Sequence, residues 1–327
     1  MPFSSGVSSS LDDFLSQLVS FAVANAGFAN EGAVTSSVGS GSRTVQRLLK
    51  GGVRWWFTRS TTSTNINASM SYSAFASGAN ISTAPTTSVA DAQSAWTHMN
   101  TWAFTGPYVG HYFFTDGTCV HAVLEVASGV FNHISFGNVS KFGTWTGGEY
   151  LTGGYYTFTT TTGGITTYGN AFGINYHSRP FNDESDANAI TTGRTMVRLA
   201  NTAASADFQG VRGVSLDSHS MFVGVAQNSG QDIGSMYTRL LRDAPNETTA
   251  RTPLFPGFFR RYDSASGLYR LAGTIPYAAF MKMSADMNAK DIINTDWQVF
   301  PITMRTGGDA TLAAPSNEYA LAYRRVA

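Results

Sequence analysis

The sequence has little of what marks a disulfide-bonded, metal-rich or highly charged protein. Cys119 is the single cysteine among 327 residues, which excludes an intrachain disulfide and any metal site built from several thiolates. Charged residues make up 13% of the chain, against roughly 25% in an average soluble domain. Lys plus Arg and Asp plus Glu both number 21, so no net basic charge attracts phosphate groups, and we expect no nucleic-acid partner.

Long hydrophobic runs are absent as well. No apolar stretch reaches the length of about 18 residues that a membrane-spanning helix needs, so we predict no membrane span. The apolar segment 14–26 follows Asp12 and Asp13, whereas an export signal begins with cationic residues. We therefore expect no export signal and attach no glycan to the Asn-x-Ser/Thr sites.

What is present is ample core material, 43% hydrophobic and 13% aromatic, together with one clear helix pattern. Apolar residues recur at helical spacing over 11–23, Ser10 can cap the first turn with Asp13 three residues on, and Gly27 can end the helix. We expect the serine-rich leader 4–10 to lack regular structure. The apolar stripe packs either on its own domain or on a neighbouring subunit.

From about residue 43, short runs of Val, Ile, Thr, Tyr, Phe and Trp alternate with turn residues, which is typical of β-strands. We predict a mainly β protein, with a β-rich sandwich or barrel-like body and an N-terminal α-helix. Its parts are an N-terminal arm and helix (1–30), a β-rich lobe (31–180) and a second β-rich lobe (181–327), with the polar insertion 181–193 at the boundary. A shorter helix is predicted over 278–288. The predicted strands are 53–60, 111–115, 119–126, 130–136, 150–160, 165–168, 171–177, 221–225, 257–262, 268–275 and 297–302.

Two hairpins are predicted, over 119–136 and 257–275. In the first, alternation places Cys119, His121, Val123 and Glu125 on one face, and a short turn brings Phe131, His133 and Ser135 onto the same face of the partner strand. Thiolate, imidazole and carboxylate groups on one face are transition-metal ligands, so Cys119, His121, Glu125 and His133 are the metal candidates. A packed face whose polar groups hydrogen-bond to their neighbours explains the same pattern. We predict no metal, no cofactor and no catalytic residue.

Other patterns carry weaker hypotheses. The aromatic groups 55–57 and 155–156 have the composition of a sugar-stacking surface, although core packing explains them as well. No phosphate-binding glycine loop, dinucleotide fingerprint, serine-hydrolase elbow or zinc-protease helix occurs. Calcium ligands would come from Asp183, Glu184, Asp186 and Asn188, and a pair of glycosidase carboxylates from Glu125, Glu149 or Asp296.

Several blocks of the sequence, spread over roughly residues 40–327, resemble a family of structural proteins from the virions of tailed bacteriophages. The matching blocks are GHYFFT (110–115), VHAVLEV (120–126), NHISFG (132–137), KFGTWTGG (141–148), GLYRLAGTIP (267–276), WQVFP (297–301) and YALAYRR (319–325).

The resemblance implies a virion protein without an active site. Its partners would be copies of itself and other virion proteins, as a homo-oligomer in the tail, baseplate or neck, with residues 1–30 available as an arm that reaches a neighbour. The alternative is a receptor- or carbohydrate-binding tail fibre or decoration protein that recognises a host surface glycan. An enzyme acting on envelope polysaccharide is a third class.

Overall fold

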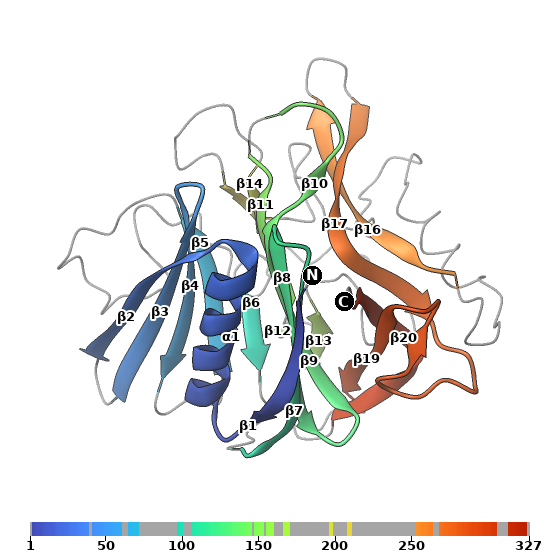
Figure 1. Cartoon of the computed structure of the whole chain (residues 1–327), viewed down its shortest axis with the longest axis horizontal. Helices are drawn as coiled ribbons and strands as arrows, with labels where there is room; N and C mark the ends of the chain where they lie inside the picture. The colour runs from blue at the N-terminus through green and yellow to red at the C-terminus, as the bar shows by residue number, and fades with distance from the viewer. Residues whose placement is uncertain are drawn as a thin grey trace.

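The computed structural model describes residues 2–38, 41–60, 65–71, 97–100, 106–145, 147–153, 155–159, 166–170, 196–198, 208–210, 253–263, 268–305 and 313–325. Within these ranges, helix α1 (Leu11–Ala26) accompanies three antiparallel sheets (Figure 1). The central sheet has the order β1 (Phe3–Ser8), β7 (Tyr108–Thr115), β8 (Cys119–Ala127), β9 (Val130–Asn138), β11 (Glu149–Gly153), β14 (Met196–Arg198) and β15 (Phe208–Gly210).

The other two sheets are named by their position. The helix-side sheet has the order β13 (Thr166–Asn170), β12 (Tyr155–Thr159), β6 (Thr97–Asn100), β5 (Asn65–Ser71), β4 (Val53–Ser60), β3 (Gly41–Lys50) and β2 (Ala29–Val38). The C-terminal sheet has the order β10 (Ser140–Lys141), β17 (Leu268–Lys282), β20 (Ala313–Arg324), β19 (Trp297–Arg305) and β18 (Ile292–Ile293), and β16 (Phe255–Asp263) pairs with β17.

Strands β8 and β9 of the central sheet are buried on both faces. One apolar core joins α1 and the helix-side sheet to one face of β7, β8 and β9. A second core joins the opposite face of these strands to β17, β19 and β20 of the C-terminal sheet. Figure 1 shows the resulting order of layers, with α1 and strands β2 to β5 of the helix-side sheet on one side of β8 and β9 and the C-terminal sheet on the other. The predicted mainly β, sandwich-like body with an N-terminal helix is confirmed.

Helix α1 begins and ends where the sequence indicates. The Ser10 hydroxyl accepts a hydrogen bond of 3.1 Å from the Asp13 backbone N–H, and Gly27 closes the helix with φ +67°, a left-handed conformation that glycine adopts without strain. The apolar stripe packs on its own chain, with Phe14 and Phe21 both against Phe113 at ring-centroid distances of 5.6 and 5.4 Å. None of the helices in the described ranges is long and apolar enough to cross a membrane.

The predicted loose leader is wrong, because most of 4–10 belongs to β1, which pairs along β7 from Phe3↔Phe114 to Ser8↔Tyr108. The predicted helix over 278–288 is wrong too. Its first residues continue β17 and pair with β20 from Ala278↔Tyr323 to Lys282↔Tyr319. There Phe280 is buried in the core against the central sheet and Met281 in a core on the other side of the C-terminal sheet. A strand that is buried on both faces loses its alternation and cannot be distinguished from a helix by hydrophobic periodicity.

The predicted strands in the described ranges are otherwise present, except that 150–160 contains two strands, β11 and β12, which belong to different sheets. Both predicted hairpins form, as β8–β9 and β16–β17. The sequence analysis missed the longer strands β1, β2, β3, β5 and β20 and the short strands β6, β10, β14, β15 and β18. The predicted strands 171–177 and 221–225 and the boundary insertion 181–193 lie outside the described residues.

Candidate functional site

The candidate site is the face of the β8–β9 hairpin that contacts the C-terminal sheet. The register pairs His121 with Ser135 and Glu125 with Phe131, and it places His133 opposite Val123. Because strand side chains alternate, Cys119, His121, Glu125 and His133 share one face, as predicted. All four side chains are buried, with at most 5% of any one exposed.

His121 is held between the two sheets by both ring nitrogens. Its Nε2 lies 2.7 Å from the backbone oxygen of Pro276 in β17, and its Nδ1 lies 2.7 Å from Ser135 Oγ. A carbonyl oxygen only accepts, so Nε2 carries the proton and Nδ1 accepts from the serine hydroxyl. Ser135 Oγ in turn lies 2.7 Å from the Tyr150 hydroxyl, which then donates to it. The result is a chain of hydrogen bonds from Tyr150 through Ser135 and His121 to the C-terminal sheet.

His133 repeats this arrangement on the neighbouring strand. Its Nε2 donates to the backbone oxygen of Pro301 in β19 at 3.4 Å, and its Nδ1 accepts from the Tyr323 hydroxyl of β20 at 3.0 Å. The Tyr323 ring also packs against both imidazoles, at centroid distances of 5.1 Å to His121 and 5.9 Å to His133. Each histidine therefore bonds a proline carbonyl of the C-terminal sheet, and we call the two residues with these partners the histidine clamp.

Breaks in strand register accompany both carbonyl acceptors. The β16–β17 pairing moves from Phe258↔Thr274 to Pro256↔Ala279, which leaves Pro276 in a bulged stretch where Tyr277 has φ +53°. The β19–β20 register shifts immediately after Pro301. Bulges redirect backbone groups away from the regular ladder, so at these positions a carbonyl oxygen faces the central sheet instead of a neighbouring strand.

Burial determines the protonation states of the clamp. The desolvation cost of a charged imidazole lowers the pKa of His121 and of His133 to about 4, so both rings are neutral at pH 7. Burial likewise raises the pKa of the Cys119 thiol and of the Tyr150 and Tyr323 hydroxyls well above their ordinary values. Cys119 lies 3.5 Å from His121 Nε2, but its thiol is protonated and enclosed. A neutral network of this kind holds two sheets in place and supplies no activated nucleophile.

Glu125 belongs to a separate cluster at the turn end of the hairpin. Its carboxylate pairs with Lys290 Nζ at 3.2 Å and accepts hydrogen bonds from the Tyr112 hydroxyl at 3.3 Å and the Gly129 N–H at 3.1 Å. Desolvation, with the nearby carboxylate second, raises the pKa of Tyr112 to about 12. The structure thus brings Cys119 and His121 together but separates Glu125 from them. Within the described ranges, no three His, Cys, Asp or Glu side chains are placed to share a metal ion.

The weaker sequence candidates have mixed outcomes. Trp55 and Phe57 are fully buried, and Trp55 Nε1 donates to the Tyr150 backbone oxygen at 3.0 Å, so this aromatic group is core. Asp296 forms an ion pair of 2.5 Å with Arg324. The side chains of Tyr155 and Tyr156 and the acidic residues 183–188 lie outside what the structure describes.

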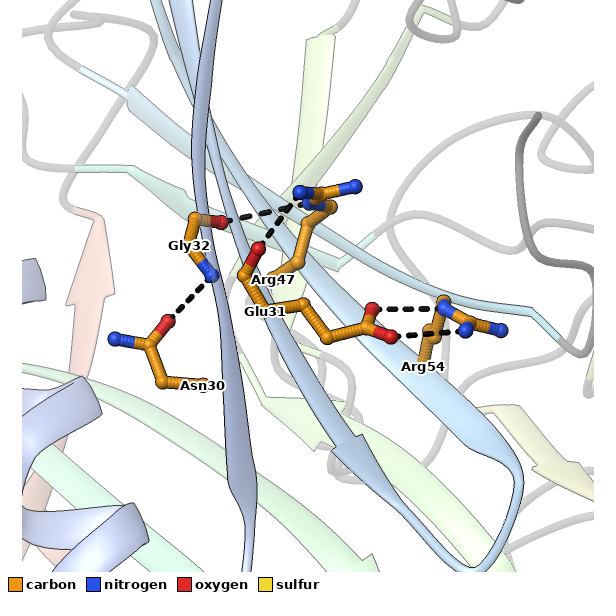
Figure 2. Close-up of polar contacts among 5 residues, drawn as sticks. All are labelled: Asn30, Glu31, Gly32, Arg47 and Arg54. Atoms are coloured by element: carbon orange, nitrogen blue, oxygen red, sulfur yellow. Dashed lines mark hydrogen bonds and ion pairs between the residues drawn. The ribbon is translucent and has the colours of Figure 1, made fainter. Parts of the chain in front are cut away.

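A polar cluster that the sequence did not indicate lies on the edge strand β2. The register with β3 shifts between Asn30 and Ala33, and Gly32 takes φ +81° in this bulge. Figure 2 shows how it is fixed: the Glu31 carboxylate accepts two hydrogen bonds from Arg54, of 2.7 and 2.8 Å, while Arg47 donates to the Glu31 backbone oxygen at 2.7 Å. We call Glu31, Gly32, Arg47 and Arg54 the β2 bulge lock. A bulge and charged groups at a sheet edge discourage another strand from pairing there.

Comparison of the sequence with models of known protein families, and with curated proteins, gave no match.

Proposed function

We propose that this chain is a non-enzymatic structural component of a tailed-phage virion that assembles as a homo-oligomer in the tail, baseplate or neck. The resemblance of the sequence blocks to such proteins supports a role in the virion. Four of these blocks lie on β7, β8, β9 and β17, where the central and C-terminal sheets are joined. A structural component acts through its shape, which must be rigid. The low charge of this protein and the buried neutral network that joins its sheets are consistent with such a role.

The proposal of a homo-oligomer rests on the position of β1 at the end of the central sheet. Among the described strands β1 pairs only with β7, and its sequence FSSGVS contains no charged residue and no proline. Val7 in β1 is 61% exposed and Val109 in β7 is 49% exposed, and both lie at the register break between Gly6 and Ser8. The edge at β2, by contrast, carries the β2 bulge lock. An edge strand that has no charged residue of its own and carries an exposed apolar group favours pairing with another copy at β1.

Native mass spectrometry of the purified protein tests this assembly. We expect a wild-type species of several subunits, and we expect Val7→Asp to shift it toward the monomer because a charge at the contact is costly to bury. Val23→Asp is the matched control, since Val23 is 39% exposed and lies in the last turn of α1 instead of in β1. A monomeric wild type would contradict the proposed homo-oligomer. An equal effect of both variants would contradict the proposal that subunits contact each other at the β1 edge.

The place in the virion needs a separate measurement. Quantitative mass spectrometry of purified virions, separated into heads and tails, counts copies of this chain relative to the portal. A fixed multiple of three or six in the tail fraction is the result expected of a ring or baseplate part built from copies of one chain. Absence from both fractions would overturn the virion role.

A further inference from the structure

Another buried histidine lies where β1, β7 and α1 meet. His111 of β7 is opposite Gly6 of β1, and only 2% of the residue is exposed. Its ring stacks on Phe113 at a centroid distance of 4.7 Å, and Phe14 of α1 meets it edge-on at 6.4 Å. The ring therefore faces α1, on the opposite side of the central sheet from the histidine clamp, and the clamp does not explain it.

His111 contacts β1 at two points. Its Nδ1 lies 2.9 Å from the Ser8 hydroxyl oxygen, which also accepts from Gln17 Nε2 of α1 at 3.5 Å. The hydroxyl proton is then available to Nδ1, which accepts it as an unprotonated nitrogen. The second point is Gly6, where a Cβ would lie 2.9 Å from Cε1 of the ring and 3.0 Å from Nε2. The ring thus lies directly against the backbone of the edge strand.

Burial makes a charged His111 ring costly while β1 is docked on β7. Desolvation lowers the pKa of His111 below its usual 6.5, and the Asp13 carboxylate of α1 opposes this with a smaller effect. A proton on Nδ1 would also leave the Ser8 hydroxyl facing a second donor instead of an acceptor. The docked form of β1 therefore favours the neutral ring.

The described elements around the ring bring little compensating charge. Strands β1 and β7 have the sequences FSSGVS and YVGHYFFT, which contain no Asp, Glu, Lys or Arg. On β8, Glu125 lies on the opposite face, with the histidine clamp. On α1, Asp12 pairs with Arg59 at 3.1 Å. This leaves Asp13 as the charged group that acts on the ring from the described part of the chain.

We propose that His111 is a pH-sensitive latch on β1, which holds this strand on β7 at neutral pH and releases it when the ring takes up a proton. Once β1 leaves, the ring meets water and binds a proton that the docked form does not bind. Each pH unit below about 6.5 then favours release by up to about tenfold. The latch acts within one subunit. Its consequence for assembly, that acid separates copies paired at β1, rests on the proposed function.

Hydrogen–deuterium exchange of the full-length protein, read by mass spectrometry at pH 7.5 and 5.5, tests the latch. After correction for intrinsic exchange, protection of β1 should be severalfold lower at pH 5.5, with about tenfold as the limit for one proton. The β8–β9 hairpin reports unfolding of the whole protein, and the edge strand β2 reports a general loosening of sheet edges. No decrease in β1, or an equal decrease in β2, would overturn the latch.

Dilution separates the latch from assembly. The decrease in β1 protection should be the same at tenfold lower protein concentration, because docking of β1 on β7 is intramolecular. A decrease that changes on dilution would belong to dissociation of subunits and would contradict the latch. A monomeric wild type would contradict the homo-oligomer, but the exchange measurement would still test the latch.

Two pairs of variants assign the effect to the ring. His111→Gln keeps a polar side chain that takes up no proton, so protection of β1 should no longer depend on pH, whereas His133→Gln in the histidine clamp should keep the decrease. Gly6→Ala leaves the histidine in place but brings a methyl group against the ring, so protection of β1 should fall at pH 7.5. Ser5→Ala, at the neighbouring exposed position, should leave it unchanged. A pH dependence that persists in His111→Gln, or unchanged protection in Gly6→Ala, would contradict the latch.

Discussion

The two faces of the β8–β9 hairpin are equally buried but differ in how they hold their neighbours. The face toward α1 is apolar, with Leu124, Ile134 and Phe136 packed against the helix and the helix-side sheet. The opposite face presents His121 and His133 to the C-terminal sheet and bonds it through backbone carbonyls. Apolar contacts supply burial energy without a directional requirement, whereas hydrogen bonds in a dry interior fix position and register. One hairpin thus combines a face that provides stability with a face that provides alignment.

The largest effect is expected on the apolar face, from Phe136→Ala. The Phe136 ring is fully buried and contacts Phe28, Trp55 and Phe57 at centroid distances of 5.3, 6.5 and 5.0 Å. Truncation leaves a cavity among aromatic rings, so the free energy of unfolding should fall by about 4 kcal/mol. Urea unfolding followed by tryptophan fluorescence measures the loss. Phe142→Ala is the control, because Phe142 is 46% exposed. A similar loss of stability in both variants would show that burial on the apolar face adds no more stability than an exposed ring does.

The second largest effect is a pH dependence of stability that only the polar face of the hairpin should show. The pKa of His133 is about 4 in the folded protein and ordinarily 6.5, so between these pH values the unfolded chain takes up a proton that the folded chain does not. The stability that depends on the neutral ring is complete above pH 6.5 and is lost as the pH falls toward 4. This loss amounts to about 3 kcal/mol for His133. His121 contributes in the same direction.

The comparison of wild type with His133→Gln isolates this contribution. Urea unfolding at several pH values from 7 to 4 should give a steeper decline for the wild type, by about 3 kcal/mol over the range. Carboxylates such as Asp13 and Asp116, whose pKa values are lowered, titrate in both proteins and cancel in the difference. Parallel declines in the two proteins would mean that His133 is not held neutral between the sheets.

Local sequence signals predicted those parts of the molecule that depend on near neighbours. Ser10 and Gly27 act within one turn of α1, and alternation correctly placed His121 and His133 on one face of a hairpin. The partners of these histidines could not be predicted, since Pro276 and Pro301 lie more than 150 positions along the chain and accept through backbone oxygens at register breaks. Backbone acceptors leave no mark in side-chain composition.

The same physical limit explains the wrong predictions. Ser4 and Ser5 have no apolar pattern, and they form a strand because β7 offers an edge to pair with. The segment at 278–282 is apolar on both sides because it lies between two cores, which removes the period of two. The Trp145 side chain is held by an indole bond to Ala272, 127 positions away in the sequence, so residue spacing alone could not predict where it lies.

The smallest effect tests whether the polar face works as a connected network. Ser135→Ala removes the hydroxyl between Tyr150 and His121, and it leaves the tyrosine donor and the imidazole acceptor without that partner while the apolar face is unchanged. Unsatisfied buried polar groups cost about 1–2 kcal/mol, and urea unfolding should show a decrease of this size. Ser128→Ala, in the exposed turn of the same hairpin, should change stability by less than about 0.5 kcal/mol. If the two serine variants were equally stable, the hydrogen-bond network would contribute nothing to stability. The two sheets would then be held together by apolar packing alone, and the two faces would differ only in their residue types.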